Sequence, residues 1–101
     1  MARRVEWSAR ARKDYLQLLD YIAQTDPNAA DRVSDRIFAA AENLGVRPTG
    51  RPGRVAGTYE RTVAKTSHII AYQQTEETIF VVRVIHMSRD WPRGGWPKDE
   101  N

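Results

Sequence analysis

The chain contains no cysteine, and none of its apolar runs approaches 18 residues. The first absence excludes a disulfide framework, a thiolate zinc site and a cysteine nucleophile. The second argues against a transmembrane helix. The basic N-terminus is not followed by the apolar stretch of a secretory signal. We therefore expect a protein of the reducing cytoplasm that has no membrane partner.

Metal-binding and phosphate-binding patterns are also missing. The two histidines are eighteen residues apart, the carboxylates do not cluster, and no glycine-rich phosphate motif opens a helix. We expect neither a metal nor a cofactor. A chain of 101 residues fits one domain, 1–101, with a C-terminal tail from about residue 90. A core of this size leaves little room for a deep cavity.

The net charge of +3 conceals a segregation of charge along the chain. Residues 1–13 and 46–65 each carry five bases and one acid, whereas residues 14–45 carry six acids and two bases. Thirteen of the sixteen bases are arginine. Arginine favours planar, two-point contacts with carboxylate or phosphate groups, so the basic segments are candidate contacts for an acidic or nucleic-acid-bound partner.

The N-terminal half predicts a strand and two helices. Val5 to Trp7 alternates, Ser8 is a good N-cap, and a helix should follow to about residue 24. Asp26 and Pro27 suit the start of a second helix, which Gly45 should end. Apolar residues recur at helical spacing: Ala11, Tyr15, Leu18, Leu19 and Ile22, then Ala30, Val33, Ile37, Ala40, Ala41 and Leu44. We expect a hairpin that buries these positions and leaves its acids, Asp14, Asp20, Asp31 and Asp35, facing solvent.

The C-terminal half predicts strands. Residues 45–57 contain four glycines and two prolines and are expected to form a loop. Residues 58–64, 67–74 and 78–87 then alternate or run apolar, and the last segment should lie inside a sheet. The fold class is therefore α+β in two layers: an N-terminal helical hairpin on a mainly antiparallel four-stranded sheet, in β-α-α-β-β-β order.

Two histidines and one arginine carry the candidate chemistry on these strands. His86 ends the last strand and can serve as a general acid, or it can simply bond a neighbour at the sheet edge. Whether His68 shares its face depends on a register that the sequence does not reveal. Arg83, among apolar neighbours, is expected to be buried and paired with a carboxylate, for which Glu60 is a plausible partner.

Arginines and tryptophans are the candidate contact residues. Arg54, Arg61 and Arg89 can offset phosphate charge, and Arg51 projects from the same glycine-rich loop as Arg54. Trp91 and Trp96 lie in a Pro/Gly-rich tail, where each either folds back on the core or anchors an interface.

Several segments together resemble the RelE/ParE superfamily of bacterial toxins, and most closely its ParE-type branch. They are Val5-Glu6-Trp7-Ser8-Ala9-x-Ala11-x-x-Asp14, Tyr21-Ile22-Ala23, Pro27-x-Ala29-Ala30, Gly50-Arg51-x-Gly53-Arg54-Val55-x-Gly57-Thr58-x-Glu60, Ile70-Ala71-Tyr72 and Arg83-Val84-Ile85-His86-x-x-Arg89-Asp90-Trp91-Pro92. They span about residues 5–92, and the order of elements derived above is the order of that family.

The resemblance implies the toxin of a type II toxin–antitoxin pair, held in a hetero-oligomer with a cognate antitoxin. ParE-like toxins bind DNA gyrase and trap it on cleaved DNA, and they are not themselves catalysts. The motif from Arg83 to Pro92 favours this activity. Arg51, Arg54, Arg61, Arg89, Trp91 and Trp96 are then the residues expected to contact the target or the antitoxin.

The other branch gives an alternative. RelE-like toxins enter the ribosome and cut mRNA, which needs a base, an acid and cations for the phosphorane. His68 stands where cleaving relatives commonly hold an arginine, and His86 and Arg89 lie near positions where some carry catalytic groups. The lysine-rich region of RelE is missing. A third alternative is a degenerate toxin that only binds its antitoxin as a co-repressor.

Overall fold

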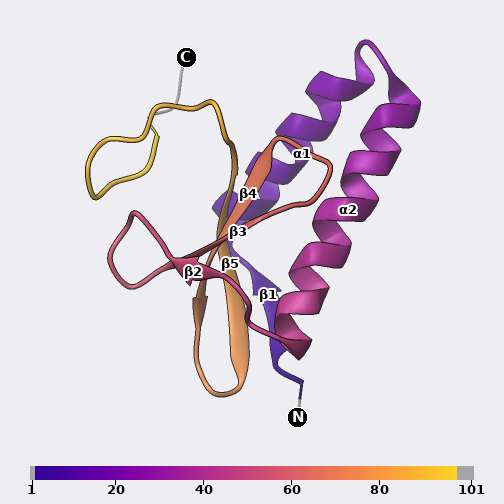
Figure 1. Ribbon diagram of the computed structural model, residues 1–101. Coiled ribbons are helices and arrows are strands. Elements are labelled where there is room, and N and C mark those ends of the chain that lie inside the picture. The colour runs from indigo at the N-terminus through magenta and orange to yellow at the C-terminus, as the bar shows by residue number, and fades with distance from the viewer. Residues whose placement is uncertain (1, 98–101) are drawn as a thin grey trace.

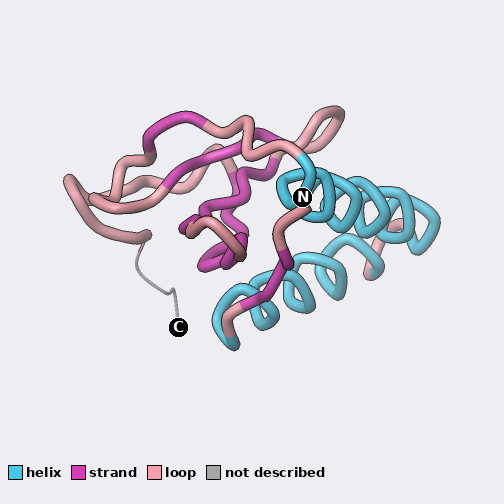
Figure 2. Tube along the Cα trace, turned by 90° about the horizontal axis from the view of Figure 1, so that it is seen from below, coloured by secondary structure: helices cyan, strands magenta, loops and turns pink. Residues whose placement is uncertain are grey.

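The computed structural model describes residues 2–97, in which the chain forms two helices and five strands (Figure 1). The helices are α1 (Ala9–Ala23) and α2 (Pro27–Val46), and the strands are β1 (Arg4–Trp7), β2 (Arg51–Pro52), β3 (Tyr59–Thr62), β4 (His68–Gln74) and β5 (Thr78–His86). Figure 2 shows both helices on one side of the sheet, which confirms the two-layer α+β fold. The sheet has five strands rather than the predicted four, because the short strand β2 forms within the predicted loop and pairs with β3. Residues 98–101, the end of the predicted tail, fall outside the described residues.

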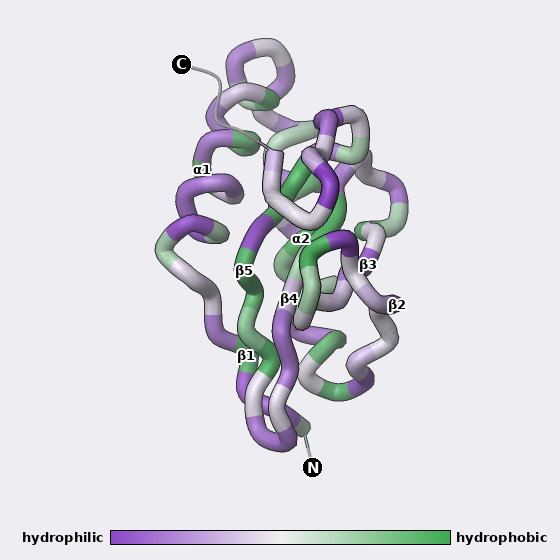
Figure 3. Tube along the Cα trace, turned by 90° about the vertical axis from the view of Figure 1, so that its left-hand side faces the viewer, coloured by the Kyte–Doolittle hydropathy of each residue, from purple (hydrophilic) through white to green (hydrophobic). Residues whose placement is uncertain are grey.

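The strands form one mixed sheet in the order β1-β5-β4-β3-β2. β1 pairs with β5 in parallel, and the other neighbours pair antiparallel. β5 therefore lies between two strands, as its apolar sequence predicts. Figure 3 shows β5 coloured hydrophobic over most of its length beside the largely hydrophilic α1.

A β-bulge interrupts the pairing of β4 with β5. Tyr72 pairs with Val81 and Ala71 with Arg83, so Val82 has no partner across this ladder. In a regular strand, Val81 and Val84 would face opposite sides of the sheet, since side chains alternate. Both belong to the core cluster packed beneath the helices. The extra residue thus resets which side chains of β5 face the helices.

The helix starts agree with the sequence predictions. The Ser8 side chain accepts a hydrogen bond from the Ala11 amide at 2.9 Å and caps α1. Asp26 likewise accepts from the Ala29 amide at 3.1 Å, and Pro27 occupies the first turn of α2. Both caps satisfy amides that have no partner inside the helix.

Gly45 has a different role from the predicted one. α2 continues through Gly45 to Val46, so the prediction that glycine ends the helix is wrong. A Cβ at position 45 would lie 2.7 Å from the Arg3 carbonyl oxygen and 2.9 Å from Val5 Cγ2. Glycine is needed here because β1 crosses close to the helix, and the Arg3 amide donates to the Gly45 carbonyl at 2.7 Å.

The core lies between the hairpin and one face of the sheet. Its helix residues include Ala11, Ile37, Ala41 and Leu44, and its strand residues include Ile70, Tyr72, Ile79 and Val81. Leu18 packs against this cluster, whereas Leu19 is half-buried and outside it. The predicted burial is therefore confirmed for Ile37 and wrong for Leu19.

Candidate functional site

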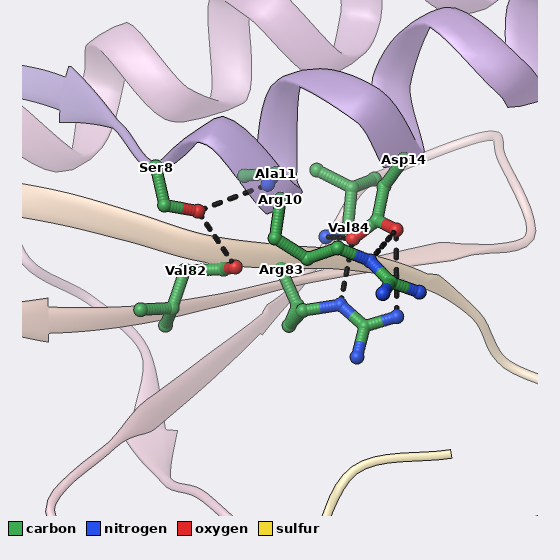
Figure 4. Close-up of polar contacts among 7 residues, drawn as sticks. All are labelled: Ser8, Arg10, Ala11, Asp14, Val82, Arg83 and Val84. Atoms are coloured by element: carbon green, nitrogen blue, oxygen red, sulfur yellow. Dashed lines mark hydrogen bonds and ion pairs between the residues drawn. The ribbon is translucent and has the colours of Figure 1, made fainter. Parts of the chain in front are cut away.

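The start of α1 continues the sheet edge where β1 ends. Trp7, the last residue of β1, pairs with Val81, and the Ser8 amide donates to the Val81 carbonyl at 2.9 Å. Beyond Ser8, side chains of α1 and its cap replace the backbone as hydrogen-bond partners of β5 (Figure 4). Ser8 Oγ donates to the Val82 carbonyl at 3.0 Å, and Asp14 Oδ2 accepts from the Val84 amide at 3.0 Å. Polar groups of β5 that would otherwise be buried without partners are thereby satisfied.

Asp14 is also the carboxylate that neutralises Arg83. Arg83 Nε donates to Asp14 Oδ2 at 2.8 Å, Arg83 Nη2 reaches Oδ1 at 3.4 Å, and Arg10 Nε donates to Oδ1 at 3.1 Å (Figure 4). Asp14 and Arg83 are 9% and 8% exposed. The prediction of a buried, paired Arg83 is confirmed, but Glu60 as its partner and a solvent-facing Asp14 are wrong.

Asp14 is the buried carboxylate of this site that the sequence prediction placed in solvent, although its position contained a signal. Asp14 follows Ala11 by three residues and precedes Leu18 by four, so it lies on the apolar face of the helix. A carboxylate on that face requires a buried cation. Asp20, Asp31 and Asp35 are exposed, as predicted.

His68 and His86 come together at the open end of the sheet. They are directly opposed in the β4–β5 register, and their ring centroids are 5.1 Å apart at an interplanar angle of 82°. Burial of His68, and to a lesser degree the charge of His86, lowers the pKa of His68 from 6.5 to about 4. His86 is exposed, and its Nδ1 accepts a hydrogen bond from the Ser88 amide at 3.0 Å.

The two histidines line a cleft of about 640 Å³ between α1 and the end of β5. Arg10, Lys13, Gln17 and Tyr21 of α1 form one wall, and Arg89 follows β5 on the other. A hollow of about 350 Å³ adjoins it and is lined by Leu18, Ile22 and Val33 as well as by the histidines. The three proposed nuclease residues, His68, His86 and Arg89, are therefore gathered around one opening.

The two C-terminal tryptophans lie against arginines of the sheet and its loop. The Arg54 guanidinium lies 4.3 Å from the centre of the Trp91 ring, and that of Arg83 lies 5.8 Å from the centre of the Trp96 ring. The two rings are 5.7 Å apart. Cation–π contacts of this kind hold the tail against the arginines. Both tryptophans are half-buried.

Glu60 of β3 lies between the C-terminal tail and the arginines Arg51 and Arg61 at the β2 edge of the sheet. Its carboxylate accepts from the Arg54 amide at 2.8 Å and forms an ion pair with Arg54 Nε at 3.7 Å. Glu60 also lines a hollow of about 290 Å³ together with Arg51 and Arg61, and Arg61 donates to the Thr49 hydroxyl. Of the six predicted contact residues, five thus adjoin this edge or the tail, while Arg89 belongs to the cleft.

No helix within residues 2–97 has the length and apolar character needed to cross a membrane.

Comparison with known proteins places these features in one family. Residues 5–91 match the family described as "ParE toxin of type II toxin-antitoxin system, parDE". Y4kP of Sinorhizobium fredii is 35% identical over 92 residues, which cover 90% of this chain and 95% of that protein. Toxin RelE2 of Caulobacter vibrioides is 34% identical over 86 residues, 84% of this chain and 96% of that toxin. In fold, the chain is similar to a chain of the chromosomal ParDE toxin–antitoxin system from P. aeruginosa (TM-score 0.77, 18% identity, 84% and 96% coverage).

Proposed function

Because the chain belongs to the ParE toxin family of type II toxin–antitoxin systems, within the RelE/ParE superfamily, we propose that it arrests growth by inhibiting DNA gyrase and is neutralised by a cognate antitoxin. That it is a toxin of this superfamily follows from the family match over residues 5–91. Gyrase as the target rests on the sequence from Arg83 to Pro92, which is typical of the ParE-type branch, and on the chemistry of the cleft.

The state of the two histidines is the observation that carries the proposal. His86 Nδ1 accepts a hydrogen bond from the Ser88 amide at 3.0 Å and also contacts the Ser88 hydroxyl at 2.7 Å, so this nitrogen is engaged within the chain. A general acid needs the doubly protonated ring, which would break that hydrogen bond. His68 is 8% exposed with a pKa of about 4, so it is neutral at pH 7 and a weak base. Burial weakens His68 as a base and the bond to Ser88 engages His86 Nδ1, which together favour a toxin that acts by binding.

We place the gyrase contact on the side of the sheet that carries the loop and the tail. Arg51 is exposed at the sheet edge, Arg61 lies beside it, and Arg54 and Trp91 are in contact. In Figure 1 the loop that follows β2 and the C-terminal tail both project on the side away from the helices. Arginine and tryptophan are the residues that most often dominate the energy of an interface. The surface is also suited to a target that holds DNA.

The test is a supercoiling assay with purified gyrase. We expect the wild-type chain to block supercoiling and to increase the fraction of cleaved DNA. Arg51→Glu should raise the concentration needed for half-inhibition about fivefold, since it reverses one exposed interface charge. Arg32→Glu changes an arginine of α2 that is also exposed; it is the matched control and should change little. No inhibition by the wild-type chain, or equal effects of the two variants, would contradict the proposal.

A second function is favoured by the gathering of His68, His86 and Arg89 around one cleft, and by the similarity to toxin RelE2. In this alternative the chain cuts mRNA on the ribosome. Primer extension on mRNA after induction tests it, with His86→Ala as the diagnostic variant. Cleavage that depends on His86, together with unaffected gyrase, would replace the first function by the second.

A further inference from the structure

The β2 edge of the sheet has a step, and a hollow lies at that step. β2 pairs with Tyr59 and Glu60, whereas β3 continues to Thr62. From Arg61 onward, β3 is therefore the edge of the sheet. The hollow of about 290 Å³ is lined by Thr49, Arg51, Glu60, Arg61 and Thr62. We call it the β2 hollow.

The lining of the β2 hollow is polar throughout. All five lining residues carry polar or charged side chains. A contact between two proteins usually has an apolar centre, whereas contacts with nucleic acid are more polar and more positively charged. Within residues 2–97, no aromatic ring lines the hollow, and proteins that bind single strands stack the bases on such rings. The lining therefore favours the backbone of a double strand.

The two arginines of the β2 hollow have charges to offer. Arg51 is exposed and Arg61 is half-buried, and neither forms an ion pair with a carboxylate within residues 2–97. Arg61 instead donates to the Thr49 hydroxyl, which is uncharged. Guanidinium groups make their strongest hydrogen bonds with carboxylate and phosphate oxygens. Both side chains are therefore suited to an anion that enters the hollow.

Glu60 is the acid that lines the β2 hollow, and Arg54 already neutralises it. Glu60 is 6% exposed, accepts from the Arg54 amide at 2.8 Å and lies 3.7 Å from Arg54 Nε. In the sequence it is the only acid between Glu42 and Glu76. The bases of that stretch are Arg47, Arg51, Arg54, Arg61 and Lys65. The field around the hollow is therefore positive and attracts phosphate.

Tyr72 fixes the segment that carries Thr49 and Arg51. The Gly50 amide donates to Tyr72 Oη at 2.8 Å, and the Tyr72 side chain is fully buried and stacked on Tyr59. A Cβ at position 50 would overlap the Tyr72 hydroxyl, so glycine is needed for this close approach. Groups that are fixed before binding lose less entropy when a ligand arrives. The hollow is therefore preorganised for its anion.

We infer that the β2 hollow binds a backbone phosphate of the double-stranded DNA that gyrase holds. Arg51 and Arg61 neutralise the phosphate, and the Thr49 hydroxyl donates to one of its oxygens. The inference rests on the proposed gyrase target and names the part of that target which these arginines contact. Because phosphates carry no sequence information, binding should not depend on the DNA sequence.

The experiment measures binding of the purified chain, without gyrase, to a short fluorescein-labelled DNA duplex by fluorescence anisotropy over a range of salt concentrations. Arg51→Gln and Arg61→Gln test the two cations. Arg32→Gln and Arg36→Gln of α2 are the matched controls, because Arg32 is exposed like Arg51 and Arg36 is half-buried like Arg61. Circular dichroism confirms that each variant is folded.

We expect each hollow variant to weaken binding about fivefold at low salt and to reduce the slope of log affinity against log salt by about one. Arg61→Lys should keep the wild-type slope, because it keeps the charge. A merely structural role of Arg61 would not preserve the slope in lysine and reduce it in glutamine. Both control variants should bind like wild type.

No binding by the wild-type chain, or equal losses in the hollow and control variants, would overturn the inference. So would a glutamate-rich peptide or a single-stranded RNA that binds more tightly and responds to the same variants. Displacement of the duplex by inorganic phosphate at equal phosphate concentration would overturn it in favour of a free anion. Supercoiling by gyrase is measured separately, so failure of the proposed target and failure of the hollow are distinguishable.

Discussion

Removing the carboxylate of Asp14 should destabilise the fold more than any other single charge deletion on α1. Asp14→Ala leaves Arg83, which is 8% exposed, without its partner at 2.8 Å, and leaves the Val84 amide without its acceptor. Breaking a buried ion pair on one side costs about 3–5 kcal/mol. A domain of this size has a total stability of about 5–15 kcal/mol, so the loss is a large part of the whole.

The assay is equilibrium unfolding in urea, followed by circular dichroism. With a slope near 1.5 kcal/mol per molar urea, the midpoint should fall by about 2–3 M. Asp20→Ala, an exposed acid on the same helix, is the control and should change the stability by less than about 0.5 kcal/mol. The double variant Asp14→Ala with Arg83→Met should recover about half of the loss, because it leaves no buried charge.

Hydrogen exchange gives an independent readout of the same contact. The Val84 amide should exchange faster in Asp14→Ala, since its acceptor is gone. If Asp14→Ala unfolds within about 1 kcal/mol of wild type, or if Arg83→Met brings no recovery, the ion pair does not hold α1 against β5 and the reasoning fails.

Three further predictions concern other parts of the fold. Gly45→Ala should lower the free energy of unfolding by about 1–3 kcal/mol, because the added Cβ would meet the Arg3 carbonyl. Alanine favours helices, so a variant more stable than wild type would show that β1 can move away from α2. The pKa of His68 is about 4 when folded and 6.5 otherwise, so the unfolded chain gains a proton first as pH falls below 6.5. Stability should therefore drop by about 2–3 kcal/mol between pH 7 and 4.5, and His68→Gln should flatten this dependence in urea titrations at the two pH values. Ile37→Ala should cost about 2–4 kcal/mol and Leu19→Ala about 1 kcal/mol in the same assay, and the reverse order would refute the observed helix face.

Local signals in the sequence located the elements well. The caps at Ser8 and Asp26 and the apolar periodicity of the hairpin depend on residues within one or two turns of each other. The prediction at Gly45 failed because its cause is distant: the constraint is the backbone of Arg3, which follows from the way β1 crosses α2.

The partners of charged residues could not be read from the sequence. Arg83 binds Asp14, 69 positions away, rather than Glu60. Glu60 instead accepts from Arg54, six positions before it. The local sequence indicated that Arg83 is buried and that Arg54 projects from the loop. Which carboxylate binds each arginine depends on how α1 and the loop pack on the sheet.

The sequence by itself indicated the two helices, the four longer strands and the family, since these depend on periodicity and short motifs. The tertiary structure decided whether His68 and His86 meet. Counting back from the pair Gln74–Ile79, a regular ladder would set His68 opposite Ile85. The bulge at Val82 adds one residue to β5, so His68 faces His86 instead. A shift of one residue in register leaves the alternating pattern of each strand unchanged, so only the paired strands reveal it.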